Sequence, residues 1–174
     1  FYFRLNRREL NGEYRIYKIK EKEWLLERVD EPQFNFLRDN IQPMLSETAT
    51  QPPGENDYLF EVKWDGIRAQ LIRRGGETFL WSRGEELVTD RYPEVVEAAA
   101  PLPDGTVLDG ELLPWFDGKV MPFAQLQRRI GRKTLGKKLL AEVPVIFLCY
   151  DLLEADGADW RERPLSARRA RLIE

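Results

Sequence analysis

Apolar and polar residues alternate through much of residues 1–30, which is the pattern of short strands that bury one face. Phe3 and Leu5 begin one such run, and a similar run follows it. Asn11-Gly12 and the charged residues 20–23 have the composition of turns. We predict two or three short strands in this region, joined at these two places.

A second alternating stretch covers residues 60–65, where every other residue is apolar. The polar positions between them are Glu61, Lys63 and Asp65. Successive side chains of a strand point to opposite faces, so the pattern predicts a half-buried strand with all three polar groups on one face.

Turn and helix signals divide the rest of the chain. Gly75-Gly76 predicts a hairpin between strands at 67–73 and 78–82, and Asp117-Gly118 predicts a turn after a strand around 108–115. The other predicted elements are helices at 91–100 and 123–129, a central strand at 143–153 and a helix at the end of the sequence. Together they predict an α+β fold with mixed, mainly antiparallel sheets and a few helices.

Residues 31–57 are rich in proline and lack a clear period, so we expect a linker and lead-in there. The chain then divides into a short β-rich segment at 1–30, the linker at 31–57, and a domain at 58–174. A chain of 174 residues suits one domain with an appendage. Since it starts with Phe1 rather than methionine, we expect a fragment of a longer protein.

Composition limits the chemistry that the chain can perform. It has no histidine, which excludes Ser/His and Cys/His catalysis and histidine-ligated metals, and its single cysteine, Cys149, excludes a disulfide framework. Cys149 lies in an apolar run and is expected to be a buried structural thiol. No apolar run approaches the ~20 residues of a membrane span, so we expect a soluble, cytoplasmic protein without a membrane partner.

The net charge of −3 does not by itself indicate a nucleic-acid-binding protein. Two local clusters of basic residues are more informative, one between 128 and 138 and one between 161 and 171. Either could contact phosphates of a nucleic acid. Each could also be the solvated face of a helix, and the leucines spaced through the second cluster favour that alternative there.

Lys63 is a candidate covalent nucleophile. A free lysine has a pKa of about 10.4, so its amine reacts poorly at neutral pH unless desolvation or a nearby cation favours the neutral form. Gly66 allows a ligand to approach the backbone, and the guanidinium of Arg68 suits a phosphate or a ribose oxygen. The alternative is an ordinary exposed strand with a charged face.

Lys63-Trp64-Asp65-Gly66-Ile67-Arg68 matches the K-x-D-G-x-R signature of the covalent nucleotidyltransferases. Three further segments resemble later motifs of that superfamily in the same order: Ser82-Arg83-Gly84, Asp109-Gly110-Glu111-Leu112 and Phe147 to Leu153. Residues 60–174 most resemble a bacterial ATP-dependent DNA ligase, and the resemblance covers about two thirds of the chain. It implies an adenylation domain of the nucleotidyltransferase, ATP-grasp-like type.

The resemblance implies that Lys63 attacks the α-phosphate of ATP and forms a lysyl-AMP intermediate. It implies that Glu61 contacts the adenine amine, that Arg68 and Arg83 contact ribose or phosphate, and that Glu111 contacts the ribose or a metal-bound water. Phe147 best fits the aromatic residue that stacks on the base, with Tyr150 as the alternative.

ATP and Mg2+ are the implied cofactors, and Glu111 is the candidate metal ligand. Asp109 and Glu111 lie two residues apart on one face of a strand, where two carboxylates require a cation, donor or water.

The implied activity is the sealing of nicks or breaks in double-stranded DNA during DNA repair or recombination. End-joining or repair proteins are possible partners, in a bacterial or archaeal cytoplasm next to the nucleoid. Residues 1–30 weakly resemble the end of the 3'-phosphoesterase domain of bacterial end-joining ligases, but without histidine they carry no inferred phosphoesterase activity.

Two later motifs of the family, Glu-Gly and Lys-x-Lys, do not follow Asp151. We therefore expect an adenylation domain that is incomplete at its C-terminus, and weak or no ligation by this piece alone. Two other readings remain open. One is an RNA ligase or capping-type nucleotidyltransferase, and the other is a nucleic-acid-binding fragment without catalysis.

Overall fold

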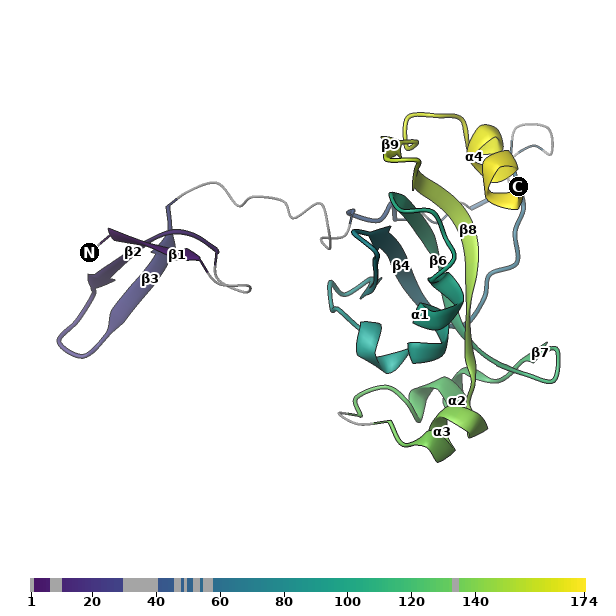
Figure 1. Cartoon of the computed structure of the whole chain (residues 1–174), viewed down its shortest axis with the longest axis horizontal. Helices are drawn as coiled ribbons and strands as arrows, with labels where there is room; N and C mark the ends of the chain where they lie inside the picture. The colour runs from purple at the N-terminus through teal and green to yellow at the C-terminus, as the bar shows by residue number, and fades with distance from the viewer. Residues whose placement is uncertain are drawn as a thin grey trace. The chain divides into compact units, whose positions relative to one another are not determined.

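The computed structural model describes residues 2–6, 11–29, 41–45, 48, 50–51, 54, 58–132 and 135–174. The chain forms two compact units, Phe1–Asp39 and Asn40–Glu174. Figure 1 shows the order of their helices and strands.

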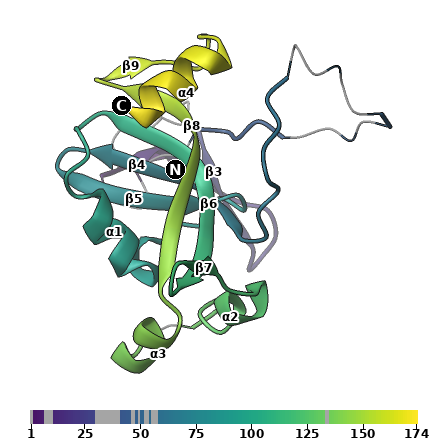
Figure 2. The same ribbon diagram turned by 90° about the vertical axis from the view of Figure 1, so that its right-hand side faces the viewer.

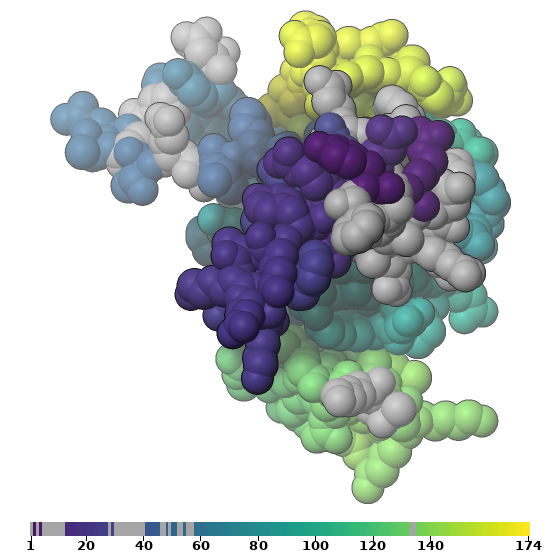
Figure 3. All heavy atoms as spheres, turned by 90° about the vertical axis from the view of Figure 1, so that its left-hand side faces the viewer, coloured from purple at the N-terminus to yellow at the C-terminus, as the bar shows by residue number. Residues whose placement is uncertain are grey.

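The first unit is a three-stranded antiparallel sheet, coloured purple in Figure 3, with the order β1-β2-β3. Its strands are β1 (Tyr2–Asn6), β2 (Asn11–Lys18) and β3 (Trp24–Arg28), which confirms the prediction of short strands. The charged turn is confirmed as well, because the Ile19 N–H donates to the Glu23 carbonyl at 2.9 Å.

The predicted turn at Asn11-Gly12 is wrong. These two residues open β2, where they pair with Asn6 and Leu5 of β1. The antiparallel pairing continues through Asn11, so the connection falls at residues 7–10, which lie outside the described residues.

The second unit is built on a sheet with strand order β5-β4-β6-β8-β9, in which all neighbours are antiparallel. The strands are β4 (Ile67–Arg74), β5 (Glu77–Ser82), β6 (Thr106–Phe116), β7 (Lys119–Val120), β8 (Val145–Ala155) and β9 (Ala158–Asp159), with β7 paired to the end of β6. The expected α+β layout, the two hairpins and the long apolar strand are confirmed. Gly75 and Gly76 have φ values of 60° and 75°, the left-handed geometry of a tight two-residue turn.

Helices pack around this sheet. They are the 3-10 turn η1 (Thr89–Arg91) and the helices α1 (Pro93–Ala99), α2 (Phe123–Gln127), α3 (Lys137–Glu142) and α4 (Leu165–Ile173). Figures 1 and 2 show α4 near one end of β8, and α2 and α3 at the other end. In the described part of the chain, no helix is long and apolar enough to cross a membrane.

The two faces of the sheet have different roles. Ala69 and Leu71 of β4 point into the main core with residues of α1 and β6. Ile72 points to the other face, where a smaller apolar cluster includes Val107. Arg68 has the same parity as Ile72, and β4 therefore presents this arginine on the face opposite the main core.

The predicted strand at residues 60–65 is wrong. Residues 58–65 form no regular secondary structure, and the Phe60 and Val62 side chains are exposed. Regular pairing of β4 with β6 begins only at Ile67, opposite Leu112, and the last two residues of β6 pair with β7 instead. An alternating pattern alone does not make a strand where no partner strand is free.

The basic cluster at 128–138 is not a continuous phosphate-binding surface. Arg129 is 0% exposed and pairs with Glu94, and it also donates to the Val143 carbonyl at 3.0 Å and lies over the Tyr92 ring. This guanidinium joins the residues after α2 to α1 and to the connection between α3 and β8. Its role is structural.

Cys149 packs against the main core, in agreement with its expected structural role. Burial raises the pKa of its thiol to about 11, so the thiol remains protonated at neutral pH.

Candidate functional site

A pocket of about 650 Å³ opens on the sheet face opposite the main core. This volume is in the range of sites for small molecules and cofactors. Its walls are the lead-in residues 41–45, residues 61–64, and side chains from β4, β6, β8 and α4.

Five of the six predicted site residues line this pocket: Glu61, Lys63, Arg68, Arg83 and Glu111. Phe147 is not among the lining residues. Residues separated by up to 50 positions in the sequence are thus brought to one cavity by β4, β6 and the turn after β5.

Arg68 is held in a fixed orientation by Asp109. Its Nε and Nη2 donate to the two carboxylate oxygens at 3.2 and 2.6 Å, and its Nη1 donates to the Met44 carbonyl at 2.6 Å. The hydrogen bonds to Asp109 raise the pKa of Arg68 further above its ordinary value, so this group is a permanent cation in the pocket wall. Asp109 itself is 4% exposed.

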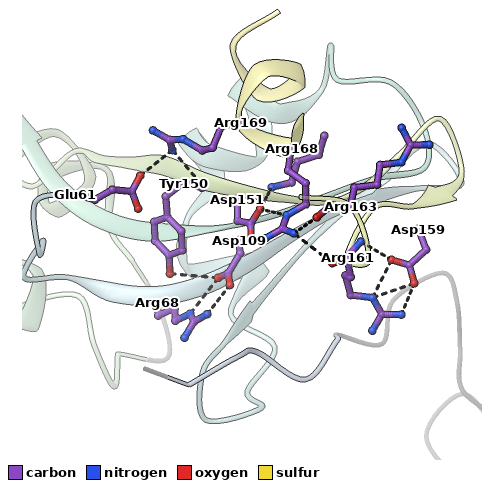
Figure 4. Close-up of polar contacts among 11 residues, drawn as sticks. Glu61, Arg68, Asp109, Tyr150, Asp151, Asp159, Arg161, Arg163, Arg168 and Arg169 are labelled. Carbon is purple, nitrogen blue, oxygen red and sulfur yellow. Dashed lines mark hydrogen bonds and ion pairs between the residues drawn. The ribbon is translucent and has the colours of Figure 1, made fainter. Parts of the chain in front are cut away.

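The Tyr150 hydroxyl completes this group by donating to Asp109 at 3.3 Å (Figure 4). Burial, followed by the charge of Asp109, raises the pKa of Tyr150, so the phenol remains protonated. Arg68 also lies 5.9 Å from the centre of the Tyr150 ring.

Glu111 is the half-buried carboxylate of the pocket. Desolvation raises its pKa, while a hydrogen bond from the Gly66 backbone and the charges of Arg68 and Lys63 act in the opposite direction. Gly66 approaches β6 closely, since an added Cβ would lie 2.4 Å from the Leu112 carbonyl oxygen and 2.8 Å from Cγ of Glu111. A glycine is therefore required at this position to bring residues 58–65, the lysine segment, next to Glu111.

Arg83 is placed by the turn after β5. Its backbone N–H donates to the Arg68 carbonyl at 3.0 Å, which keeps the two arginines adjacent. The Glu85 N–H donates to the Ser82 carbonyl at 3.0 Å within the same turn.

Gln70 holds the lead-in residues 41–45 against the sheet by hydrogen bonds to the Ile41 backbone. Its side-chain amide accepts from the Ile41 N–H at 2.8 Å and donates to the Ile41 carbonyl at 2.5 Å. With the bond from Arg68 to Met44, this contact makes residues 41–45 one wall of the cavity.

A bulge in β8 decides which aromatic residue faces the pocket. Gly110 pairs with Cys149 and Asp109 pairs with Asp151, so Tyr150 is an extra residue between the two pairs. The bulge turns both Tyr150 and Asp151 to the pocket face. Bulges of this kind often redirect side chains next to active sites.

Phe147 precedes the bulge and packs on the opposite face, against the main core. Its ring rests on Gly110, where an added Cβ would lie 2.6 Å from Cζ of Phe147. The structure thus places Tyr150, the alternative aromatic residue, in the pocket and Phe147 outside it.

Sequence reasoning missed the contribution of α4. Arg168 donates from Nε and Nη2 to the Asp151 carboxylate at 2.7 and 3.0 Å, and Arg169 forms an ion pair with Glu61 at 3.0 Å (Figure 4). The leucine spacing indicated a helix but gave no sign of its position beside the lysine segment.

An open pocket on one face of an antiparallel sheet, lined by arginines and carboxylates and by an exposed lysine from an irregular segment, is the arrangement of a nucleotidyltransferase-type domain. The chain belongs to the ATP-dependent DNA ligase domain family, whose family model matches residues 42–174.

Similar proteins agree with this assignment. The chain is 44% identical over 126 residues to a probable DNA ligase of Opitutus terrae, covering 72% of this chain and 12% of that protein. It is 42% identical over 135 residues to DNA ligase C2 of Mycolicibacterium smegmatis, covering 76% of this chain and 37% of the relative. The chain therefore spans only a minor part of these two relatives.

A solved structure of mycobacterial DNA ligase D complexed with ATP and MES is similar, with a TM-score of 0.53 and 32% identity. The match covers 65% of this chain and 35% of that chain. These comparisons confirm the family resemblance and the fold class inferred from the motifs.

Proposed function

We propose that this chain is the ATP-binding part of a DNA ligase and that Lys63 is its adenylated nucleophile. The observation that carries the proposal is the convergence of Lys63, Arg68, Arg83 and Glu111 on one pocket in a chain of this family. The similarity to a ligase complexed with ATP supports ATP as the nucleotide.

The proposed step is an in-line displacement. The neutral Nζ of Lys63 forms a bond to the α-phosphorus of ATP, the bond from that phosphorus to the bridging oxygen breaks, and pyrophosphate leaves with the electron pair. The amine proton passes to solvent or to a nearby base. Such transfers depend mainly on positioning and on stabilising charge at the phosphates.

The residues of the pocket supply both the positioning and the positive charge that this transfer needs. The Asp109 carboxylate and the Met44 carbonyl hold Arg68, so the guanidinium needs no reorganisation when phosphate or ribose arrives. Arg83 adds a second cation beside it, and this one is exposed. In this proposal Glu61 accepts from the adenine amine and Glu111 binds the ribose or a metal-bound water.

We assign the base-stacking role to Tyr150 rather than to Phe147. The Tyr150 ring lines the pocket, and its hydroxyl is fixed by Asp109. A fixed aromatic face suits any purine, and base–aromatic stacking contributes about 1–3 kcal/mol per base.

Mg2+ fits this site as an ion that arrives with the ATP phosphates. The described residues contain no cluster of three or more candidate metal ligands, and Arg68 occupies the Asp109 carboxylate. Glu111 remains as a carboxylate on the pocket wall, which suffices because Mg2+ usually keeps several waters and binds few protein ligands. The ion would neutralise charge on the phosphates.

For the protein to which this chain belongs, we propose nicked or broken double-stranded DNA as the substrate, in DNA repair or recombination in the cytoplasm. The names of the relatives support a DNA substrate. The exposed Lys137 and Lys138 of α3 are available for phosphate contact, in contrast to Arg129.

The test is incubation of the chain with ATP or GTP labelled at the α-phosphate, with and without Mg2+. We expect label to enter the protein from ATP when Mg2+ is present and to be absent in Lys63→Ala. Label of equal strength in Lys63→Ala would exclude this lysine as the nucleophile. Preference for GTP would indicate a capping-type enzyme instead.

A further inference from the structure

Two consecutive arginines connect α4 to the pocket in different directions. Arg168 binds the Asp151 carboxylate of β8 and also donates from Nη1 to the carbonyls of Arg163 at 2.6 Å and Arg161 at 3.2 Å. These contacts fix the turn before α4 and the helix itself against the bulged part of β8.

Arg169 extends from this fixed helix toward the lysine segment. Its Nη1 lies 3.0 Å from Oε1 of Glu61 and donates to the Tyr150 carbonyl at 3.0 Å. Figure 4 shows Arg169 pointing toward Glu61 above Tyr150. One guanidinium thus joins α4, the bulge of β8 and the segment that carries Lys63.

Residues 58–65 have few other anchors. They form no regular secondary structure, and the side chains of Tyr58, Leu59, Phe60 and Val62 are each more than half exposed. Within the described part of the chain, the ion pair with Arg169 is the one hydrogen bond or ion pair that these eight residues make. Apart from the half-buried Trp64 and the link to Gly66, which packs on β6, packing and backbone pairing therefore contribute little to their position.

We propose that Arg169 is a positioning residue that tethers the lysine segment to the pocket. It holds Glu61 directly, and it holds Lys63 through the two peptide units between them. Arg169 is not among the residues that line the cavity, so it acts through Glu61 rather than on the nucleotide. The consequence for ATP rests on the proposed function, whereas the tether rests on the contacts alone.

The tether should affect local geometry more than folding. The Arg169 and Glu61 side chains are 30% and 42% exposed, and ion pairs at such positions add little to global stability. If the segment leaves its binding-competent position for part of the time, the apparent affinity for nucleotide falls by that fraction.

The 19F NMR signal of Trp64, one residue after Lys63, reports the position of the segment. The chain is labelled with 5-fluorotryptophan, and the Trp64 signal is assigned in the 19F NMR spectrum with Trp64→Phe. We expect Arg169→Ala to shift and narrow this signal, and Arg169→Lys to keep it close to that of the wild type. Glu61→Gln removes the other partner of this ion pair and should change the Trp64 signal in the same way as Arg169→Ala.

Arg171→Ala is the matched control. Arg171 lies two residues further on the same helix and pairs only with the exposed Asp156 and Glu174 in the described part of the chain. Its removal should leave the Trp64 signal unchanged. An unchanged signal in both Arg169→Ala and Glu61→Gln would overturn the tether, as would an equal shift in Arg171→Ala.

ATP affinity is measured on the same proteins. We expect Arg169→Ala to raise the Kd of ATP about three- to tenfold, Arg169→Lys to recover most of the loss, and Arg171→Ala to have no effect. Unchanged affinity in Arg169→Ala would overturn the positioning role. If the wild-type chain binds no ATP, the proposed function fails, and the Trp64 signal alone decides whether the tether exists.

Discussion

Asp109 shows at the scale of one residue how a buried carboxylate fixes the wall of the pocket. It is almost inaccessible to water, and its two oxygens are shared between the Arg68 guanidinium and the Tyr150 hydroxyl. A buried carboxylate is costly without such partners, so the three side chains hold one another in place.

We expect Asp109→Asn to destabilise the chain by about 1–3 kcal/mol, because an amide cannot satisfy the buried face of Arg68. Urea denaturation measures this change. Asp117→Asn, in the exposed turn between β6 and β7, is the matched control, since asparagine tolerates the φ of 48° found there. Equal loss of stability in the two variants would contradict the role of Asp109.

Glu111 has the opposite effect on stability. Its pKa in the folded chain is raised by desolvation, so between the unfolded and folded pKa values the folded chain binds more protons. Stability therefore falls as pH rises through that window, and the full cost is present above it. Ionisation of this half-buried carboxyl therefore destabilises the folded chain slightly, at a position that we propose to bind ribose or a metal-bound water.

Glu111→Gln should accordingly be more stable than the wild type at pH 7, by less than about 1 kcal/mol because water screens the half-exposed group. The difference should shrink as pH falls toward 4, because the carboxyl becomes mostly protonated in both states. Denaturation curves at several pH values give the result. A variant that is less stable than the wild type at pH 7 would contradict this account.

At the scale of elements, the bulge in β8 separates the roles of its two aromatic residues. Phe147 lies before the bulge and packs on Gly110 and the main core, whereas Tyr150 forms the bulge and lines the pocket. One extra residue therefore changes which face the following side chains occupy.

We predict that Tyr150→Ala weakens ATP binding about five- to tenfold through loss of base stacking, and lowers stability by about 1 kcal/mol because buried Asp109 loses a hydrogen bond. Phe147→Ala should instead cost about 2–3 kcal/mol of stability by leaving a cavity over Gly110, with nearly normal affinity for ATP. Calorimetric titration and thermal unfolding of the two variants separate these effects. The reverse pattern would restore Phe147 as the stacking residue.

The elements that the sequence predicted well are those fixed by local chemistry. Gly75-Gly76 and Asp117-Gly118 demand left-handed turns, and α1 and α2 begin at or just after a proline and end near their expected positions. Alternation at residues 60–65 failed as a predictor because a strand needs a partner, and β7 pairs with the end of β6. Nothing local in the sequence marks the bulge at Tyr150.

The site was predictable to the extent that its residues lie in short motifs. Lys63, Arg68, Arg83 and Glu111 were found in this way and line one pocket. Gln70 and Arg169 were not found, since each acts on a segment remote in sequence, Ile41 and Glu61 respectively. Such pairings arise only when the sheet brings the segments together.

At the scale of the whole molecule, the pocket belongs entirely to one of the two compact units. Its lining residues run from Ile41 to Arg168, within the unit Asn40–Glu174. The sheet of β1, β2 and β3 belongs to the other unit, and none of its described residues lines the pocket.

Residues 40–174 expressed alone should therefore fold and bind ATP with a Kd within about twofold of that of the full 174-residue chain, as expected for an autonomous domain. Circular dichroism and calorimetric titration compare the two proteins. A large loss of affinity on removal of residues 1–39 would show that the first unit takes part in the site.

In the proposed mechanism Lys63 carries AMP after reaction with ATP. The most direct measurement is mass spectrometry of peptides from the chain after incubation with saturating ATP and Mg2+. We predict an AMP adduct on Lys63, labile in acid as a phosphoramidate, and no adduct in Lys63→Ala. An adduct on another residue, or no adduct on a chain that is saturated with ATP, would contradict the claim.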